Sequence, residues 1–148
     1  MFKLQEESIK IEKFKDSFKS TAHGSIVSFE GIVRADKKLN KEVRSMLYVA
    51  DKVACINEGE KIIQEALALY PIQRAACVQR INRVMAGESA IWIGVWSAHR
   101  KDSFNACEYI IENIKKRLII WKKEFFNDGT SQWLYGAQTP ILEEKYVH

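Results

Sequence analysis

The sequence predicts a single α+β domain with a mainly antiparallel sheet and two principal helices. Short apolar segments with strand-like alternation recur along the chain, and two longer segments carry apolar residues at helical spacing. Strands and helices do not alternate strictly, which argues against a parallel β-α-β sheet. A chain of 148 residues, 47% hydrophobic and 28% charged, fits one domain with a substantial core.

The first strand is predicted at Ser25–Val33, after N-terminal elements in residues 1–23. Its odd positions Val27, Phe29, Gly31 and Val33 form one apolar face. Arg34 ends this strand. Residues Ala35–Glu42 form a charged connection, and Val43–Ala50 has the composition of a second strand.

The first helix is predicted at Asn57–Tyr70, with Asn57 or the preceding turn as its cap and Pro71 as its end. Two strands follow, at Ala75–Val84 and Ser89–Ser97. The sequence Ala86-Gly87-Glu88 between them is typical of a hairpin turn.

The second helix is predicted from about Lys101 to Arg117. Its apolar stripe follows the i, i+3, i+4 rule and consists of Phe104, Cys107, Ile111, Ile114 and Leu118. A strand at Ile119–Phe126 comes next, then a turn at Asn127-Asp128-Gly129 and a short pairing segment at Gln132–Leu134.

Charge and cysteine content limit the class of protein. The net charge is +4, and basic residues are spread along the chain with Glu between them, which is a weak signal for nucleic-acid binding. The three cysteines show no metal-ligand or disulfide pattern, so Cys107 is interpreted as a core thiol in a reducing, cytoplasmic protein. The sequence contains no signal peptide and no apolar run that could span a membrane.

The junction Ser97-Ala98-His99-Arg100 is the first candidate for a binding site. It lies where a strand gives way to a helix, and the unpaired N–H groups and dipole of a helix N-terminus favour anions. The alternative is that His99 is a surface residue at a helix start. Neither a metal site nor a Ser-His-Asp triad is supported here, because second ligands and nucleophile-elbow glycines are missing.

Two downstream lysines are predicted to reach the same region. At about 100° per residue, Lys115 flanks the buried stripe of its helix, whereas Lys116 faces solvent. The alternative for Lys115 is a surface lysine whose stem packs along the helix while its ammonium stays in water. In the following strand Lys122 and Lys123 point to opposite faces, and alternation alone does not say which face is buried. The hypothesis is a pocket rich in cations and poor in carboxylates.

Four motifs together resemble the large subunit of molybdopterin synthase, the MoaE family. They are Gly24–Arg34 (GSIVSFEGIVR), Gly94–Arg100 (GVWSAHR), Cys107–Lys115 (CEYIIENIK) and Ile120–Glu124 (IWKKE). The resemblance covers residues 24–134 of a single domain 1–148 and leaves 135–148 as a C-terminal tail. The usual glycine of the family after Arg80-Ile81 is replaced by Asn82-Arg83.

The resemblance implies an α/β-hammerhead fold and a sulfur-transferring enzyme. It implies a homodimer at the centre of a heterotetramer, in which a small ubiquitin-like carrier of the MoaD type presents a thiocarboxylated C-terminal tail. The implied substrate is cyclic pyranopterin monophosphate and the product is the dithiolene molybdopterin. No metal or redox cofactor is implied, because the carrier supplies the sulfur.

The same resemblance implies roles for six residues. Lys115 and Lys122 are the catalytic lysines, whereas Arg34, His99 and Arg100 bind the cyclic phosphate and the tail, and Phe29 lines the pocket. These residue types suit the chemistry, since Arg binds phosphate in a bidentate manner. A lysine of lowered pKa acts as a base, an acid or a nucleophile, and fixed cations stabilise an oxyanion.

Two other functions remain as alternatives to the enzyme. One is a diverged, non-catalytic module that binds a carrier tail or an anionic ligand. The other is a small RNA-binding domain, which requires exposed aromatic residues among basic ones on a sheet face. Trp92 and Trp96 share a face, but their apolar surroundings predict core packing.

Overall fold

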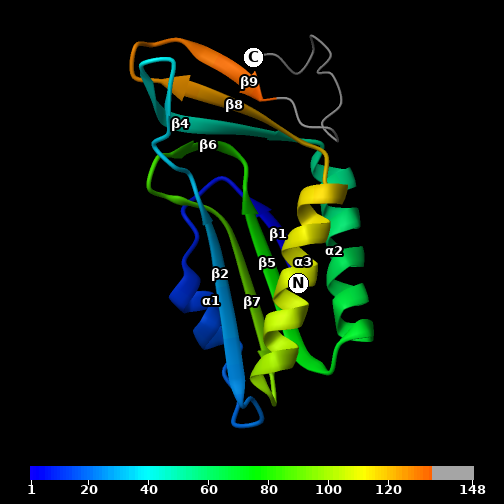
Figure 1. Ribbon diagram of the computed structural model, residues 1–148. Coiled ribbons are helices and arrows are strands. Elements are labelled where there is room, and N and C mark those ends of the chain that lie inside the picture. The colour runs from blue at the N-terminus through cyan, green and yellow to red at the C-terminus, as the bar shows by residue number, and fades with distance from the viewer. Residues whose placement is uncertain (135–148) are drawn as a thin grey trace.

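Two sheets meet in this protein, and the computed structural model describes them over residues 1–134 (Figure 1). The C-terminal tail predicted at 135–148 lies outside the described residues. In chain order the elements are β1 Phe2–Gln5, α1 Ile11–Ser17, β2 Ser25–Ile32, β3 Lys37–Lys38, β4 Lys41–Ala50, α2 Lys52–Leu69, β5 Ile72–Arg80, β6 Asn82–Met85, β7 Ser89–Ser97, α3 Arg100–Arg117, β8 Ile120–Phe126 and β9 Ser131–Leu134.

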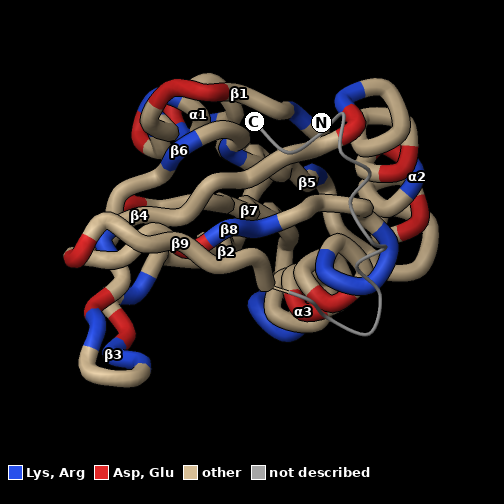
Figure 2. Tube along the Cα trace, turned by 90° about the horizontal axis from the view of Figure 1, so that it is seen from above, with Lys and Arg blue, Asp and Glu red and all other residues tan. Residues whose placement is uncertain are grey.

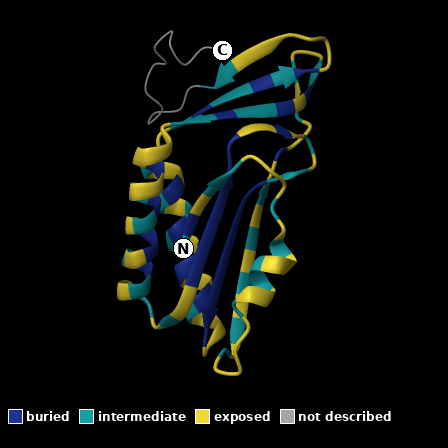
Figure 3. Ribbon diagram, turned by 180° about the vertical axis from the view of Figure 1, so that it is seen from behind, coloured by how far each residue is buried: buried dark blue, intermediate teal, exposed yellow. Residues whose placement is uncertain are grey.

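The first sheet has the strand order β1-β5-β7-β2 and is covered on both faces. Strands β5, β7 and β2 are antiparallel, and β1 joins β5 in parallel. Helices α2 and α3 lie side by side on one face and α1 lies on the other (Figure 1). Figure 3 shows the central strands as the most buried part of the molecule. The α+β class with a mainly antiparallel sheet is therefore confirmed.

The second sheet has the order β3-β4-β8-β9, with β6 also paired to β4, and sits at one end of the first (Figure 1). Strands β3 and β4 form a hairpin that projects from the body of the protein (Figure 2). Its two-residue turn places Leu39 and Asn40 at φ values of 50° and 64°, as a type I′ turn requires. The charged connection predicted at Ala35–Glu42 therefore contains a hairpin.

The chain changes sheets between β5 and β6, which corrects the single strand predicted at Ala75–Val84. Asn82 has a φ of +67°, in the left-handed region that Asn tolerates better than most residues other than Gly. It therefore suits the position at which the resemblance leads us to expect a glycine. After this break β6 pairs with β4, whereas β7 pairs with β5 and β2. The turn at Gly87 exists, but its two flanking strands belong to different sheets.

The helices differ in detail from their predicted boundaries. Helix α2 begins at Lys52, and its cap is Asp51, whose carboxylate accepts the backbone N–H of Ala54 at 3.1 Å. Phe104 of α3 is 59% exposed, which corrects the predicted stripe. Cys107, Ile114 and Leu118 of that stripe are buried as predicted, and the other buried positions of α3 are Ser103, Ala106 and Ile110.

The N-terminal residues form part of the core. The Phe2 N–H donates to a Glu60 carboxylate oxygen at 2.6 Å. A Cβ at Gly59 of α2 would lie 2.4 Å from the Phe2 ring, so only glycine lets β1 approach this closely. On the opposite face Phe14 and Phe18 of α1 and its end pack against the tryptophans of β7. The segment 1–23 is therefore integral to the first sheet.

Candidate active site

A cavity of about 450 Å³ lies where the two sheets meet the C-terminal end of α3. Strands β2, β4, β5, β7, β8 and β9 and helix α3 all contribute residues to its walls. Four of its described lining residues have polar side chains, namely Tyr48, Gln79, Lys115 and Lys122. Isoleucines of β2, β7 and α3 supply much of the remaining wall. Such a mixture of apolar surface and a few convergent polar groups is typical of a small-molecule site.

Helix α3 brings Lys115 to this cavity. Ile111, one turn earlier, and the adjacent Ile114 also line it, so this face of the helix turns toward the opening. Lys115 and Lys116 are both exposed, but Lys116, about 100° further round, is not a lining residue. The predicted distinction between the two adjacent lysines is therefore confirmed, although the stripe from which it was measured is displaced.

Strand β8 brings Lys122 to the same cavity. Its pKa is lowered from the ordinary 10.5, first because burial penalises the ammonium and second because the charge of Lys115 repels it. Lys123 points elsewhere, with its Nζ 5.5 Å from the ring centre of Phe125 and 5.2 Å from that of Trp133. The structure therefore resolves the choice that alternation left open, in favour of Lys122.

The nearest buried carboxylate to Lys122 in sequence is already paired. Glu124 has 3% of its side chain exposed, and both of its oxygens accept hydrogen bonds from Lys38 Nζ, at 2.8 and 3.0 Å. No Asp or Glu is among the described residues that line the cavity. The two lysines thus face a space without a neutralising carboxylate, as the sequence predicted for this pocket.

The predicted anion junction lies at the opposite end of α3. His99 is the N-cap residue and Arg100 begins the helix, and both are exposed. With a rise of about 1.5 Å per residue, Arg100 lies roughly 22 Å along the helix from Lys115. Neither residue lines the cavity. Within one chain, the prediction that these cations share a pocket with the lysines is therefore corrected.

Three serines, two buried and one half-buried, hold this junction in place. The hydroxyls of Ser25, Ser97 and Ser103 contact one another, and Ser97 Oγ donates to the backbone carbonyl of His99 at 2.6 Å. The hydroxyl thus engages the His99 backbone, while Ser97 and Ser103 are fully buried. A hydrolytic triad at this point is excluded, as expected from the sequence.

Arg34 and Phe29 lie near the cavity without lining it. Arg34 follows Ile32, a lining residue, by two positions, and its exposed side chain pairs with Asp36 at 3.4 Å. The ring of Phe29 packs against the main core. It lies 3.8 Å from the position that a Cβ on Gly31, another lining residue, would take. Both residues therefore belong to the surroundings of the cavity.

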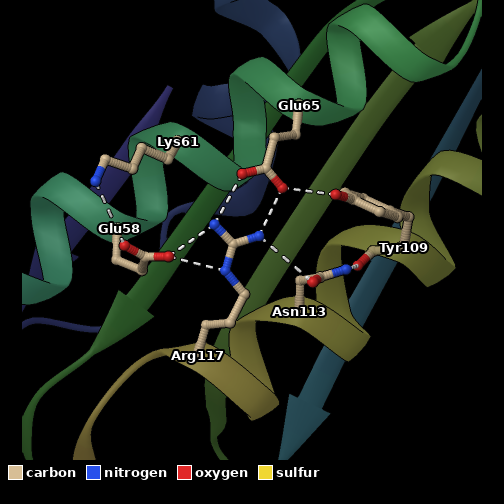
Figure 4. A network of polar contacts seen from close by, with 6 residues as sticks. All are labelled: Glu58, Lys61, Glu65, Tyr109, Asn113 and Arg117. Atoms are coloured by element: carbon tan, nitrogen blue, oxygen red, sulfur yellow. Dashed lines mark hydrogen bonds and ion pairs between the residues drawn. The ribbon is translucent and has the colours of Figure 1, made fainter.

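An ion-pair network fixes the end of α3 that carries Lys115 (Figure 4). Arg117 donates to both oxygens of Glu65, at 2.6 and 2.8 Å, and to Glu58 at 2.8 Å, so α3 is fastened to α2. The two bonds from Arg117 to Glu65, together with one from the Tyr109 hydroxyl, lower the pKa of Glu65 to about 2. The last turn of α3 is therefore anchored two residues beyond Lys115.

The described residues give no support to metal or thiol chemistry. No group of three or more His, Cys, Asp or Glu side chains within residues 1–134 is placed to hold a metal ion. All three cysteines are free and buried, and burial raises the pKa of Cys107 to about 11. The interpretation of Cys107 as a core thiol is confirmed, because a thiol of raised pKa is a poor nucleophile.

Trp92 and Trp96 are unavailable as a nucleic-acid platform. Trp92 and Trp96 are 0% and 3% exposed and pack under α1, where Phe14 stacks on Trp92 with a ring-centre distance of 5.6 Å. Stacking of bases requires exposed rings. Among the described residues, no helix combines the length and apolar character needed to cross a bilayer.

Sequence reasoning did not identify three residues around the cavity. Tyr48 and Gln79 line it directly, and Lys38 neutralises Glu124. Tyr48 is the register partner of Lys122 in the β4–β8 pairing. Strand register joins residues that are far apart in the chain, and a single sequence carries no direct signal for it.

Comparisons with known proteins agree on one family. The family model described as MoaE protein matches residues 4–117. The molybdopterin synthase catalytic subunit of Pyrococcus abyssi is 36% identical over 130 residues, covering 88% of this chain and 86% of that protein. The subunit of the same name from Thermoplasma volcanium is 40% identical over 110 residues, covering 74% and 80%.

Solved structures show the same architecture. Molybdopterin synthase from Staphylococcus aureus superposes with a TM-score of 0.83 at 31% identity, covering 90% of this chain and 96% of that one. A complex of subunits 1 and 2 of molybdopterin-converting factor from Helicobacter pylori gives 0.76 at 18% identity, covering 95% and 94%. At that identity the second likeness supports the fold alone.

Proposed function

The chain belongs to the MoaE protein family, and from this premise we propose that it is the catalytic large subunit of a molybdopterin synthase. It is an enzyme subunit that transfers sulfur from a small protein carrier to a pterin. The substrate is cyclic pyranopterin monophosphate, and the product carries the dithiolene that later holds molybdenum. The partner is a ubiquitin-like carrier of the MoaD type with a thiocarboxylated C-terminus.

One observation carries this proposal beyond family membership. Lys115 and Lys122 line one cavity that has no carboxylate among its described lining residues. Burial and the charge of Lys115 lower the pKa of Lys122, so a larger fraction of its amine is neutral and basic near neutral pH. Lys115 supplies the fixed positive charge beside it.

Sulfur transfer needs both a neutral amine and a positive charge beside it. The thiocarboxylate sulfur attacks a substrate carbon that bears oxygen. As the C–S bond forms, a C–O bond at the same carbon breaks and the departing oxygen takes up a proton, so the carrier is then attached through a thioester. Water attacks the thioester carbonyl, the C–S bond to the carrier breaks, and the carrier leaves with a carboxylate. A neutral Lys122 takes up the proton that the attacking water releases, and the Lys115 ammonium stabilises the oxyanion of the tetrahedral intermediate.

Arg34, His99 and Arg100 are proposed to bind the cyclic phosphate and the carrier tail. Because His99 and Arg100 lie far from the cavity of their own chain, this role requires a second copy that brings its α3 N-terminus to the site. The proposed assembly is accordingly a homodimer at the centre of a heterotetramer with two carriers. Phe29, behind Gly31, supports the cavity wall.

The subunit is proposed to work without a cofactor of its own, because the carrier delivers sulfur already activated as a thiocarboxylate. Its place of action is proposed to be a reducing cytoplasm. The three free cysteines support this, since thiols persist unpaired where glutathione and thioredoxin keep them reduced.

The deciding experiment mixes the purified protein with a thiocarboxylated MoaD-type carrier and cyclic pyranopterin monophosphate. Formation of molybdopterin, measured after oxidation to a fluorescent derivative, supports the proposal. A carrier that is active with a known synthase but yields no product here would overturn it. Binding of the carrier tail without turnover would favour the non-catalytic module.

A further inference from the structure

Two neutral side chains of the cavity are buried and carry unused hydrogen-bonding groups. Tyr48 is 9% exposed and Gln79 is 6% exposed, and both line the cavity with the two lysines. Neither residue is used by the proposed sulfur transfer. Buried polar groups are expensive to leave unpaired, so their presence here calls for a partner.

The orientation of the Gln79 amide is fixed by two backbone carbonyls. Its Nε2 donates to the carbonyl of Arg80 at 2.9 Å and to that of Ala90 at 3.1 Å. Both N–H groups are therefore used. Exchange of the amide oxygen and nitrogen would place the oxygen, which can only accept, against the two carbonyl oxygens. The Oε1 atom remains as an acceptor with no donor among residues 1–134.

The Tyr48 hydroxyl is similarly free to bind a ligand. It has no hydrogen-bond partner among the described residues, and apolar side chains, Val33, Val84 and Ala90, pack around its ring. Burial raises the pKa of Tyr48 to about 12, so the phenol keeps its proton at neutral pH. Tyr48 and Lys122 are directly paired across β4 and β8, which places the phenol and the amine on one face.

Both free atoms are open to the cavity. In the described part of the chain, every side-chain nitrogen or oxygen that is fully enclosed has a hydrogen-bond partner. The Tyr48 and Gln79 oxygens, which have none, must therefore keep some contact with solvent. Since both residues are more than nine-tenths buried, the cavity that they line provides that contact.

We propose that Tyr48 and Gln79 recognise the heterocycle of the substrate, with Tyr48 as a hydrogen-bond donor and Gln79 as an acceptor for a ring or exocyclic N–H. This inference rests on the proposed function. It assigns binding residues to the part of the substrate that the cationic side chains do not contact. The cavity volume of about 450 Å³ and its isoleucine walls suit a flat fused ring system.

The carrier tail is a less suitable ligand for these two groups. An extended peptide pairs with the free backbone of an edge strand. Among the cavity strands, β2 and β9 are edges of the described sheets, whereas β4 and β5 are paired on both sides. Tyr48 and Gln79 stand on these interior strands, so their side chains face the small molecule.

The test compares Tyr48→Phe and Gln79→Met with wild type in three equilibrium titrations. The probes are cyclic pyranopterin monophosphate, inorganic phosphate and the carrier without its sulfur. We expect about 3- to 10-fold weaker pterin binding for each variant, the effect of one lost hydrogen bond, with unchanged affinity for phosphate and carrier. Tyr70→Phe and Gln64→Met, outside the cavity, are the matched controls and should leave all three affinities unchanged.

The outcomes separate this inference from the proposed function. If wild type binds and converts the pterin but Tyr48→Phe retains full pterin affinity, the inference fails alone. A loss of carrier affinity in place of pterin affinity would also overturn it. If wild type neither binds nor converts the pterin, the proposed function fails. Should Gln79→Met fold poorly in thermal unfolding, Tyr48→Phe decides the matter, because it removes a single atom that remains in contact with solvent.

Discussion

The charge of Lys115 on α3 lowers the pKa of Lys122 on β8 across the cavity that both residues line. Seven positions separate them in the chain, and they belong to different elements. The pair unites a fixed cation with an amine that loses its proton more readily. Most of what can be tested about this site follows from that pairing.

The first prediction concerns the titration of Lys122. Lys115→Ala should raise the pKa of Lys122 but leave it below 10.5, because burial is the larger cause of the depression. NMR of the lysine side chains against pH measures this directly. Lys116→Ala, one residue further along the helix, is the control and should leave the titration unchanged. A Lys122 pKa that does not move in Lys115→Ala would contradict the proposed coupling.

The direction of the pH effect on stability follows from the same pKa. Between the folded pKa and 10.5 the unfolded chain binds a proton at Lys122 that the folded protein does not. Stability therefore rises with pH across that window, and the unfavourable contribution of a charged Lys122 is present below it.

The second prediction concerns turnover. Lys115→Ala and Lys122→Ala should each reduce molybdopterin formation at least about 100-fold, the range seen for loss of a general base or an oxyanion donor. Affinity for the carrier should be retained. Lys116→Ala and Lys123→Ala are matched controls, since neither lysine lines the cavity. Single-turnover assays with excess enzyme measure the loss, and equal losses in the controls would rule out a specific role.

The third prediction tests whether two copies build one site. Arg100→Ala and Lys115→Ala should each be inactive as pure proteins. Mixed and allowed to exchange subunits, they should recover about a quarter of wild-type activity, because half of the dimers are mixed and one of their two sites is intact. Absence of any recovery, despite demonstrated exchange, would mean that Arg100 acts elsewhere or only through its own chain.

The fourth prediction concerns the contact between α2 and α3. Arg117→Ala removes hydrogen bonds to Glu58 and Glu65. The network is partly solvent-screened, so we expect a loss of about 1–2 kcal/mol in the free energy of unfolding. Thermal unfolding should show a decrease of roughly 2–6 °C, largest at low salt. Lys116→Ala serves as control, and an equal decrease there would mean that the ion pairs contribute little.

The sequence predicted local features of the site better than distant ones. Helical periodicity separated Lys115 from Lys116, because both belong to one regular element whose phase can be counted. Strand alternation could not separate Lys122 from Lys123, since each face of β8 is partly buried. Which face of β8 lines the cavity depends on its pairing with β4, a strand more than seventy residues earlier in the chain.

The separation of His99 and Arg100 from the lysines follows from helix geometry alone. A helix that begins at Arg100 and includes Lys115 places about 22 Å between them. In contrast, the roles of Tyr48, Gln79 and Lys38 depend on strand register and on the change of sheet at Asn82. These are set by packing between elements, which a single sequence does not reveal.

The short links between the two sheets affect how a ligand enters the cavity. Ile81 alone separates β5 from β6, and only Leu118 and Ile119 separate α3 from β8. Opening the cavity by moving one sheet away from the other would bend both links at once. Ligand association should therefore proceed in one kinetic phase through a preformed mouth, with a rate limited by desolvation and encounter.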